Sequence, residues 1–372
     1  MFDFDALPDV AADFGDIEHQ STFCVYAVSD VHTDRKENMQ LLLSWPLRPV
    51  DVLLLAGDVS NDLGVLRATF EALTERFAHV FFCPGNHDLW LHGADGCKDS
   101  VEKYWKIEEL CQELGVRTSP GFVGEVLIVP LQSWYHASFD EEPDVLDPSL
   151  PAIEELMTDF MACKWPEGLT PFGGGDSIAR FMDRLNDSRG APPSPLRADG
   201  TRCPVISFSH FLPRKELLPE KRSLYCPPLA KAVGSKSLGE RVKQLSPDLH
   251  VFGHTHYGWC HDLDGIRYLQ ACLAYPRERV ERPFSVYCKD SSGEEVFPPL
   301  LVFDEASHRF PVYRGFWSEY YKAHDRRPDD VTWIYREPRN RGAVTKAVKR
   351  LVCELGGCLD DASISKLLQD DQ

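Results

Sequence analysis

Five short polar segments of the chain combine the residue types that hold metal ions in proteins. They are DVH at 30–32, GD at 57–58, GNHD at 85–88, SH at 209–210 and GHTH at 253–256. Asp and Asn offer hard oxygen ligands and neutral His offers a borderline nitrogen, a mixture that suits Mn, Fe or Zn and is poor for copper(I). Seven such groups are enough for two ions that share one carboxylate. The segments therefore predict a dinuclear metal site, provided that the fold brings them together.

The spacing inside the segments fits a shared site. In extended backbone alternate side chains point the same way, so Asp30 and His32, or His254 and His256, can face one cluster. Taken alone, either of the two shortest segments is typical of an ordinary turn or helix cap. The order of all five, each after an apolar run, favours the metal site. Three of the segments also contain a glycine that lets the backbone turn tightly beside the ions: Gly57, Gly85 and Gly253.

The elements that must position these segments alternate between apolar runs and stretches with helical period. FCVYAVSD ends at Asp30, DVLLLAGD ends at Asp58, and later runs carry the SH and GHTH segments. Between the second and third runs, apolar residues recur every three to four positions over 63–77, as a helix covering a sheet requires, and 104–114 repeats the pattern. Loops at the carboxyl ends of neighbouring strands converge on one crevice of an open α/β sheet. The pattern predicts an α/β fold.

The five segments, in this order, resemble the signature blocks of the calcineurin-like metallophosphoesterase superfamily. The resemblance spans Asp30 to His256 and implies a four-layer αββα sandwich of two mixed β-sheets flanked by helices. It implies that one ion is held by Asp30, His32 and His256, and the second by Asn86, His210 and His254, with Asp58 bridging them. His87 would be the catalytic acid near the leaving group, and Asp88 would orient it.

These roles imply an enzyme with a definite chemistry. Two divalent ions about 4 Å apart acidify a bridging water and clamp the oxygens of the phosphorus centre. A histidine that protonates the leaving group adds on the order of a hundredfold or more. We therefore expect a dinuclear-metal-dependent phosphoesterase that hydrolyses a small phosphomonoester or phosphodiester through a metal-bridging hydroxide, with Mn, Fe or Zn as cofactors.

The sequence departs from the Ser/Thr protein phosphatases of this superfamily. GDVSND stands where they have GDxVDRG, and GNHD stands where they have GNHE, so the arginine that would grip phosphoserine is missing. Phosphodiesterase and small-molecule phosphomonoesterase activity both stay open. The alternative from another class is a catalytically silent binding or scaffold protein with the same fold. Such members typically lose ligands or the catalytic histidine, whereas this chain keeps them.

The charge balance disfavours polyanionic partners. The chain has 40 basic and 58 acidic side chains and a formal charge of -18, so as a whole it repels nucleic acid and anionic lipid. Two cations in one cleft would reverse the local field and admit a small phosphate-ester substrate.

The first twenty residues lack Lys and Arg and no run is long enough to span a bilayer, which predicts a cytoplasmic protein. Four cysteines in or beside apolar runs are expected to be reduced thiols: Cys24, Cys83, Cys203 and Cys272.

The organisation predicts one metallophosphoesterase domain over 21–300. Residues from about 137 to 203 are rich in Asp, Glu, Pro and Gly and contain two expected helices, near 151–163 and 176–187, so we interpret them as an inserted cap. The segment 301–372 is expected to be a C-terminal extension that packs on the domain. Its amphipathic helix would present one apolar stripe, formed by Val344, Val348, Leu351 and Leu355.

Several other polar residues near the five segments stay outside the predicted metal set. Arg35, Lys36, His136, Arg214 and Lys215 could reach a substrate phosphate, although exposed cationic side chains after a loop are usually just solvated. The remaining histidines have ordinary explanations. His79 and His250 belong to strands and are expected to be structural. Four more are expected at the surface: His92, His261, His308 and His324.

Overall fold

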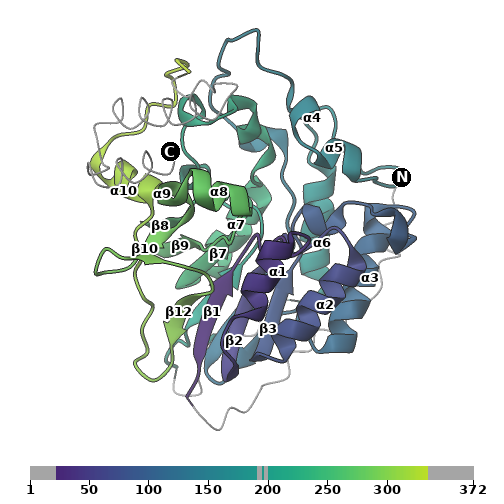
Figure 1. Cartoon of the computed structure of the whole chain (residues 1–372). Coiled ribbons are helices and arrows are strands. Elements are labelled where there is room, and N and C mark those ends of the chain that lie inside the picture. Colours follow the sequence, from purple (N-terminus) through teal and green to yellow (C-terminus); the bar gives the residue numbers. More distant parts are fainter. Residues whose placement is uncertain (1–21, 191–194, 197–199, 334–372) are drawn as a thin grey trace, which may run out of the picture.

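Two β-sheets stack face to face in the computed structural model, which describes residues 22–190, 195–196 and 200–333 (Figure 1). The first sheet has the strand order β12-β1-β2-β3. Strands β1, β2 and β3 are parallel to one another, and the edge strand β12 pairs with β1 in the antiparallel direction. The bounds are β1 (Cys24–Val28), β2 (Arg48–Ala56), β3 (Phe77–Cys83) and β12 (Leu300–Asp304).

The second sheet has six strands in the order β4-β5-β6-β7-β9-β8. The four central strands are parallel, whereas β4 and β8 are antiparallel to their neighbours, so both sheets are mixed. The bounds are β4 (Gly121–Val123), β5 (Val126–Pro130), β6 (Val205–Phe208), β7 (Leu249–Phe252), β8 (Trp259–Leu263) and β9 (Ile266–Gln270). A separate ribbon pairs β10 (Cys288–Lys289) with β11 (Glu295–Val296).

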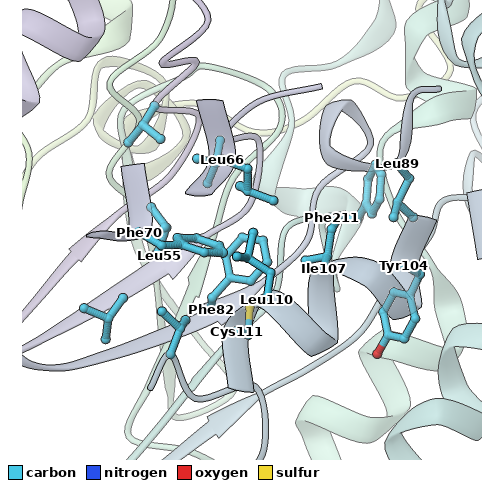
Figure 2. Packing of buried hydrophobic residues seen from close by; sticks show 14 of the residues in the cluster. Leu55, Leu66, Phe70, Phe82, Leu89, Tyr104, Ile107, Leu110, Cys111 and Phe211 are labelled. Atoms are coloured by element: carbon cyan, nitrogen blue, oxygen red, sulfur yellow. The ribbon is translucent and has the colours of Figure 1, made fainter. Parts of the chain in front are cut away.

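Helices α1 (Lys36–Leu43), α2 (Leu63–Thr74) and α3 (Ser100–Leu114) cover the outer face of the first sheet (Figure 1). Figure 2 shows Phe70 of α2 and Leu110 of α3 packed with Phe82 of β3 and Leu55 of β2. The helix expected near 104–114 begins earlier, because the side chain of Asp99 caps it by accepting a hydrogen bond from the Glu102 N–H.

Three apolar layers separate four layers of backbone. Alternation along β2 sends Leu53 and Leu55 to the helices and Val52 and Leu54 to the space between the sheets. The second sheet buries its other face, including Leu127, against α7 (Lys236–Leu245) and α10 (Phe316–Ala323). The predicted four-layer αββα fold is thus confirmed.

The described residues of the segment expected to form a cap include the α-helices α4 (Ile153–Leu156), α5 (Asp159–Ala162) and α6 (Ser177–Ser188). The helix expected over 151–163 is broken into two single turns, because Met157 adopts an extended conformation. Helix α6 matches its prediction and buries Phe181 and Leu185 in the same cluster as α2 and α3.

The division into domain, cap and extension stays a prediction, although the expected boundary at 300 falls inside β12, which is part of the first sheet. The apolar stripe expected over 344–355 lies outside the described residues. Within the described residues, every helix is too short or too polar to cross a bilayer. Cys24, Cys83 and Cys272 carry free thiols, as expected.

Candidate metal centre

The five polar segments follow β1, β2, β3, β6 and β7 at their carboxyl ends. Each of these strands is parallel to a neighbour, so their loops leave the two sheets at the same edge. The structure brings all seven predicted ligands together there, on loops that begin directly after the buried strands. The close approach needs glycine. A Cβ on Gly57 would lie 2.6 Å from His210 Nδ1, and one on Gly253 would lie 3.0 Å from Asp30 Oδ2.

The backbone at these loops differs from the extended geometry that we expected. Five of the seven residues have positive φ: Asp30 (54°), His32 (41°), Asp58 (57°), His254 (75°) and His256 (54°). The expectation that alternation in extended backbone makes the side chains face one cluster is therefore wrong; left-handed turns do so instead. Such non-glycine residues cost about 1–3 kcal/mol each and gather at functional sites. The strain indicates that the conformation of these loops is determined by where their side chains must lie, and not by the intrinsic preference of the backbone.

The first group of donor atoms comes from Asp30, His32, Asp58 and His256, all buried and with ligand atoms within 4.8 Å of one another. The Nε2 atoms of His32 and His256 lie 3.1 Å apart. Asp30 Oδ1 is 3.4 Å from His256 Nε2, and Asp58 Oδ2 is 3.9 Å from His32 Nε2. Two carboxylates and two imidazoles thus surround one point.

The second group contains Asp58, His210 and His254. Asn86 joins it, since its Oδ1 atom lies 3.0 Å from both His210 Nε2 and His254 Nδ1. Asp58 Oδ1 is 3.4 Å from His210 Nε2. Asp58 is therefore shared by the two groups through its two oxygens.

Hydrogen bonds from outside the centre fix which nitrogen of each imidazole faces inward. His210 Nδ1 donates to the Ala56 carbonyl at 3.0 Å, and His254 Nε2 donates to the Ala232 carbonyl at 2.9 Å. The inward nitrogens, His210 Nε2 and His254 Nδ1, then carry no proton. Each directs a lone pair at Asn86 Oδ1, which is also an acceptor. Three acceptors that meet without a donor repel one another unless a cation lies between them, so the residues present fit a bound metal ion.

Burial keeps three of the four histidines neutral, as metal ligation requires. It lowers the pKa of His254 to about 3, and it lowers the pKa of His210 and, more strongly, that of His32. His32 Nδ1 is buried without a hydrogen-bond partner. Burial, followed by the negative charges of Asp30 and Asp88, raises the pKa of Asp58 well above its ordinary value. A divalent cation would relieve this crowding of buried carboxylates.

His256 differs from the other histidines because it contacts two carboxylates. Burial lowers its pKa, but Glu278 and then Asp30 outweigh burial and raise it to about 10. The charge on His256 in turn brings the pKa of Asp30 to about 2 against the effect of burial. Because a metal ligand must be a neutral imidazole, a metal ion at this position would have to displace the proton of His256.

His87 lies beside both groups and is 19% exposed. Its Nε2 atom is 3.8 Å from Asp58 Oδ2 and 3.4 Å from the Tyr275 hydroxyl, and its ring stacks on Trp90 with centroids 3.6 Å apart. Burial, and then the charges that the neighbouring histidines carry when protonated, hold the pKa of His87 well below its ordinary value. His87 is the polar group of the GNHD segment that faces both the centre and solvent.

Asp88 has different partners from those we expected. Its carboxylate accepts four backbone N–H groups, those of Asp58, Val59, Ser60 and Gly85, at 2.8–3.0 Å. Both oxygens are thereby used on the loops, and neither is hydrogen-bonded to the His87 ring. Burial raises the pKa of Asp88 to about 6 against the effect of these N–H donors. Asp88 holds the loops after β2 and β3 together.

The sequence reasoning missed two carboxylates that hold proposed ligands. Glu278 on α8 (Pro276–Glu281) accepts from His256 Nδ1, and Asp159 on α5 accepts from Asn86 Nδ2. Glu278 lies inside α8 and not directly after a strand, so the rule that located the five segments does not find it. Asp159 lies in the irregular segment 137–203, where no pattern indicates a site.

A cleft of about 1000 Å³ opens onto both donor groups. Its lining includes charged side chains, among them Arg35, Glu281 and Arg282. It also includes the apolar side chains of Leu156, Met157, Leu218, Leu224, Leu229, Val233 and Trp317. The centre can therefore receive a molecule that has both an anionic and an apolar part.

Among the basic residues singled out from the sequence, only Arg35 is a lining residue of this cleft in the described part of the chain. Arg214 pairs with Glu216 and Asp264, and Lys215 pairs with Glu141. His136 is buried at the start of the expected cap and accepts a hydrogen bond from the Lys236 N–H. His250 lies between the hydroxyls of Ser207 and Ser209, which agrees with a structural role.

Comparison with known proteins places the chain in a family. The calcineurin-like phosphoesterase family matches residues 25–258. An [acyl-carrier-protein] phosphodiesterase, PptH, from Mycobacterium tuberculosis is 26% identical over 317 residues, which cover 76% of this chain and 88% of that protein. The crystal structure of the phosphopantetheinyl hydrolase PptH from the same organism aligns with a TM-score of 0.54 and 23% identity, covering 74% of this chain and 96% of that chain. The chain belongs to the calcineurin-like phosphoesterase family, outside its protein-phosphatase branch, and is a hydrolase of phosphoric esters.

Proposed function

We propose that the protein is a dinuclear-metal-dependent phosphodiesterase. The observation that carries the proposal is the sharing of Asp58 by two adjoining donor groups, one with Asp30, His32 and His256 and one with His210 and His254. Asn86 completes the second group through Oδ1. A shared carboxylate between two such groups suits a pair of Mn, Fe or Zn ions.

When bound, two divalent ions would supply an acidified water at neutral pH and offset the charge of the phosphate oxygens. The residues of the chain do the rest. Asp30, His32 and His256 would hold one ion, Asn86, His210 and His254 would hold the other, and Asp58 would serve both. Asp88 keeps the loops that carry Asp58 and Asn86 in register through its four amide partners.

His87 protonates the leaving group in this proposal. Its pKa is held low by burial and by neighbouring histidines, and an anionic ester beside it would raise that pKa, because an opposite charge favours the imidazolium. Nε2 then carries a proton and delivers it to the departing oxygen. Trp90 below the ring and the Tyr275 hydroxyl 3.4 Å from Nε2 orient the imidazole.

Two observations support a diester over a monoester. The relative PptH is named as an acyl-carrier-protein phosphodiesterase, and a cleft of about 1000 Å³ lined by both apolar and charged side chains is large enough for organic groups in addition to a phosphate. A carrier protein bearing a phosphopantetheinyl group is therefore the first substrate to test. The scaffold alternative gains no support, because the seven predicted ligands lie together and His87 lies beside them at the cleft.

The test combines metal content with turnover. Purified protein reconstituted with Mn, Fe or Zn should hydrolyse bis(p-nitrophenyl) phosphate faster than p-nitrophenyl phosphate, and mass spectrometry should detect release of the phosphopantetheinyl group from a carrier protein. Chelation should abolish both activities. Asp58→Ala should lose both ions and all turnover, whereas Asp62→Asn, on the same loop but outside the donor groups, should behave like wild type. Full activity in Asp58→Ala, or in chelated protein, would contradict the proposal.

A further inference from the structure

A carboxylate from the segment 137–203 reaches the metal centre from outside the five loops. Asp159 lies on α5 and is 2% exposed. One of its oxygens, Oδ1, accepts two hydrogen bonds: from Asn86 Nδ2 at 2.8 Å and from Trp90 Nε1 at 2.6 Å. Both donors are neutral. A buried carboxylate without a cationic partner is costly to desolvate, so a role beyond filling space is expected of it.

The first of these bonds decides which atom of Asn86 faces the centre. An asparagine amide has one acceptor oxygen and one donor NH₂ group, and rotation by half a turn exchanges them. Because the NH₂ group is held by Asp159, the oxygen is directed at His210 Nε2 and His254 Nδ1, 3.0 Å from each. In the flipped orientation, a donor that cannot bind a cation would occupy this position.

The second bond fixes the plane on which His87 rests. Trp90 stacks on the His87 ring with centroids 3.6 Å apart and planes inclined by 28°. The indole can rotate about its side-chain bonds unless its N–H is held, and Asp159 Oδ1 holds it. The backbone carbonyl of Trp90 is fixed separately by Lys103 Nζ at 2.5 Å.

We propose that Asp159 is a positioning residue of the phosphoesterase site: it orients Asn86 as a ligand of the second ion and, through Trp90, the ring of His87. This inference rests on the proposed function and extends it to the segment 137–203. The inference also means that α5 must be packed in its observed position for Asn86 to be oriented as a ligand. A substitution of Asp159 would then change ion binding although it replaces none of the seven ligands.

The test measures ion binding and turnover separately in the full chain. Asp159→Ala should bind one of two Mn²⁺ or Zn²⁺ ions about 10- to 100-fold more weakly, since loss of a partner that orients a ligand has this effect, and leave the other ion unchanged. Its kcat at saturating metal should fall while KM changes little. Asp159→Asn keeps an acceptor oxygen and should restore most of the binding. Trp90→Phe should keep both ions and lower kcat.

The matched control is Asp183→Ala. Asp183 also joins the segment 137–203 to the rest of the chain, through Arg241 Nε at 3.1 Å, but it does not contact the centre. It should retain both ions and wild-type kcat. The inference fails if folded Asp159→Ala binds two ions with wild-type affinity. If that variant does not fold, a wild-type kcat in folded Trp90→Phe, which lacks the N–H that Asp159 accepts, overturns it. Wild type that binds no metal would instead refute the proposed function.

Discussion

His256 and Glu278 are joined by a hydrogen bond of 2.5 Å between Nδ1 and Oε2. The other oxygen of Glu278 accepts from Arg282 at 2.6 Å, so the carboxylate is held from both sides. Burial raises the pKa of Glu278, but His256 and Arg282 lower it more, and it stays ionised. A proposed ligand after β7 is thus oriented by a helix that follows β9.

Glu278→Gln should weaken ion binding without removing a ligand. The neutral amide no longer makes His256 a stronger base, and it can also present its NH₂ group to Nδ1. We expect the affinity for one ion to fall about 10- to 100-fold, as is usual when such a partner is lost. Titration of chelated protein with Zn²⁺ measures the change. Glu281→Gln, on the same helix and cleft but paired with Arg277, is the control; equal affinities in both variants would contradict the role of Glu278.

Gly85→Ala should damage the centre through space alone. A Cβ at this position would overlap Asp58 Oδ1 and lie 2.7 Å from the Asp58 nitrogen and 2.8 Å from His210 Cε1. Asp58 would have to move from its place between the donor groups, so we expect loss of at least one ion and of most turnover. Elemental analysis of purified protein checks this. Gly93→Ala, where a Cβ would meet nothing within 4 Å, should be neutral; normal metal content in Gly85→Ala would show that the loop can relax.

His87→Ala should keep both ions and lose turnover. His87 is outside the two donor groups, so metal content should stay at the wild-type value. General acid catalysis contributes about 10²–10⁴-fold, and we expect kcat to fall by that factor for alkyl leaving groups and by less for p-nitrophenolate, which needs no proton. Rates on both kinds of ester measure the difference. His92→Ala, an exposed histidine on the same loop, is the control. An equal loss on both esters would argue against proton donation.

The five loops could be predicted from the sequence because strand, loop and ligand are adjacent in the chain. An apolar run that ends in Asp, Asn or His predicts a strand and also the polar residue that follows its carboxyl end, as at Val28 to Asp30. Parallel pairing then brings the ends together, since β1, β2 and β3 share one direction. Local pattern and sheet geometry were enough for this part.

The groups that orient the ligands were not predictable in the same way. Asp159 is 73 positions from Asn86 and lies on a single helical turn whose burial depends on tertiary packing. The left-handed backbone of Asp30 and His32 was likewise not predicted, because Asp and His adopt positive φ more often than most residues but still in a small minority of cases. Contacts that depend on how distant segments pack leave no periodic signal along the chain.

Lys103→Met should destabilise the protein, although Lys103 itself is not a lining residue of the cleft. Lys103 is fully buried, its Nζ atom lies 2.7 Å from Asp95 Oδ2, and it donates to the carbonyls of Asn61 and Trp90. Removing one partner of a buried pair leaves an uncompensated charge and costs about 3–5 kcal/mol. Urea denaturation in chelator measures it, so that ion binding does not mask the loss. Lys98→Met, exposed and two residues before the same helix, should change the free energy of unfolding by less than about 0.5 kcal/mol. A change below about 1 kcal/mol in Lys103→Met would mean that Asp95 finds another partner.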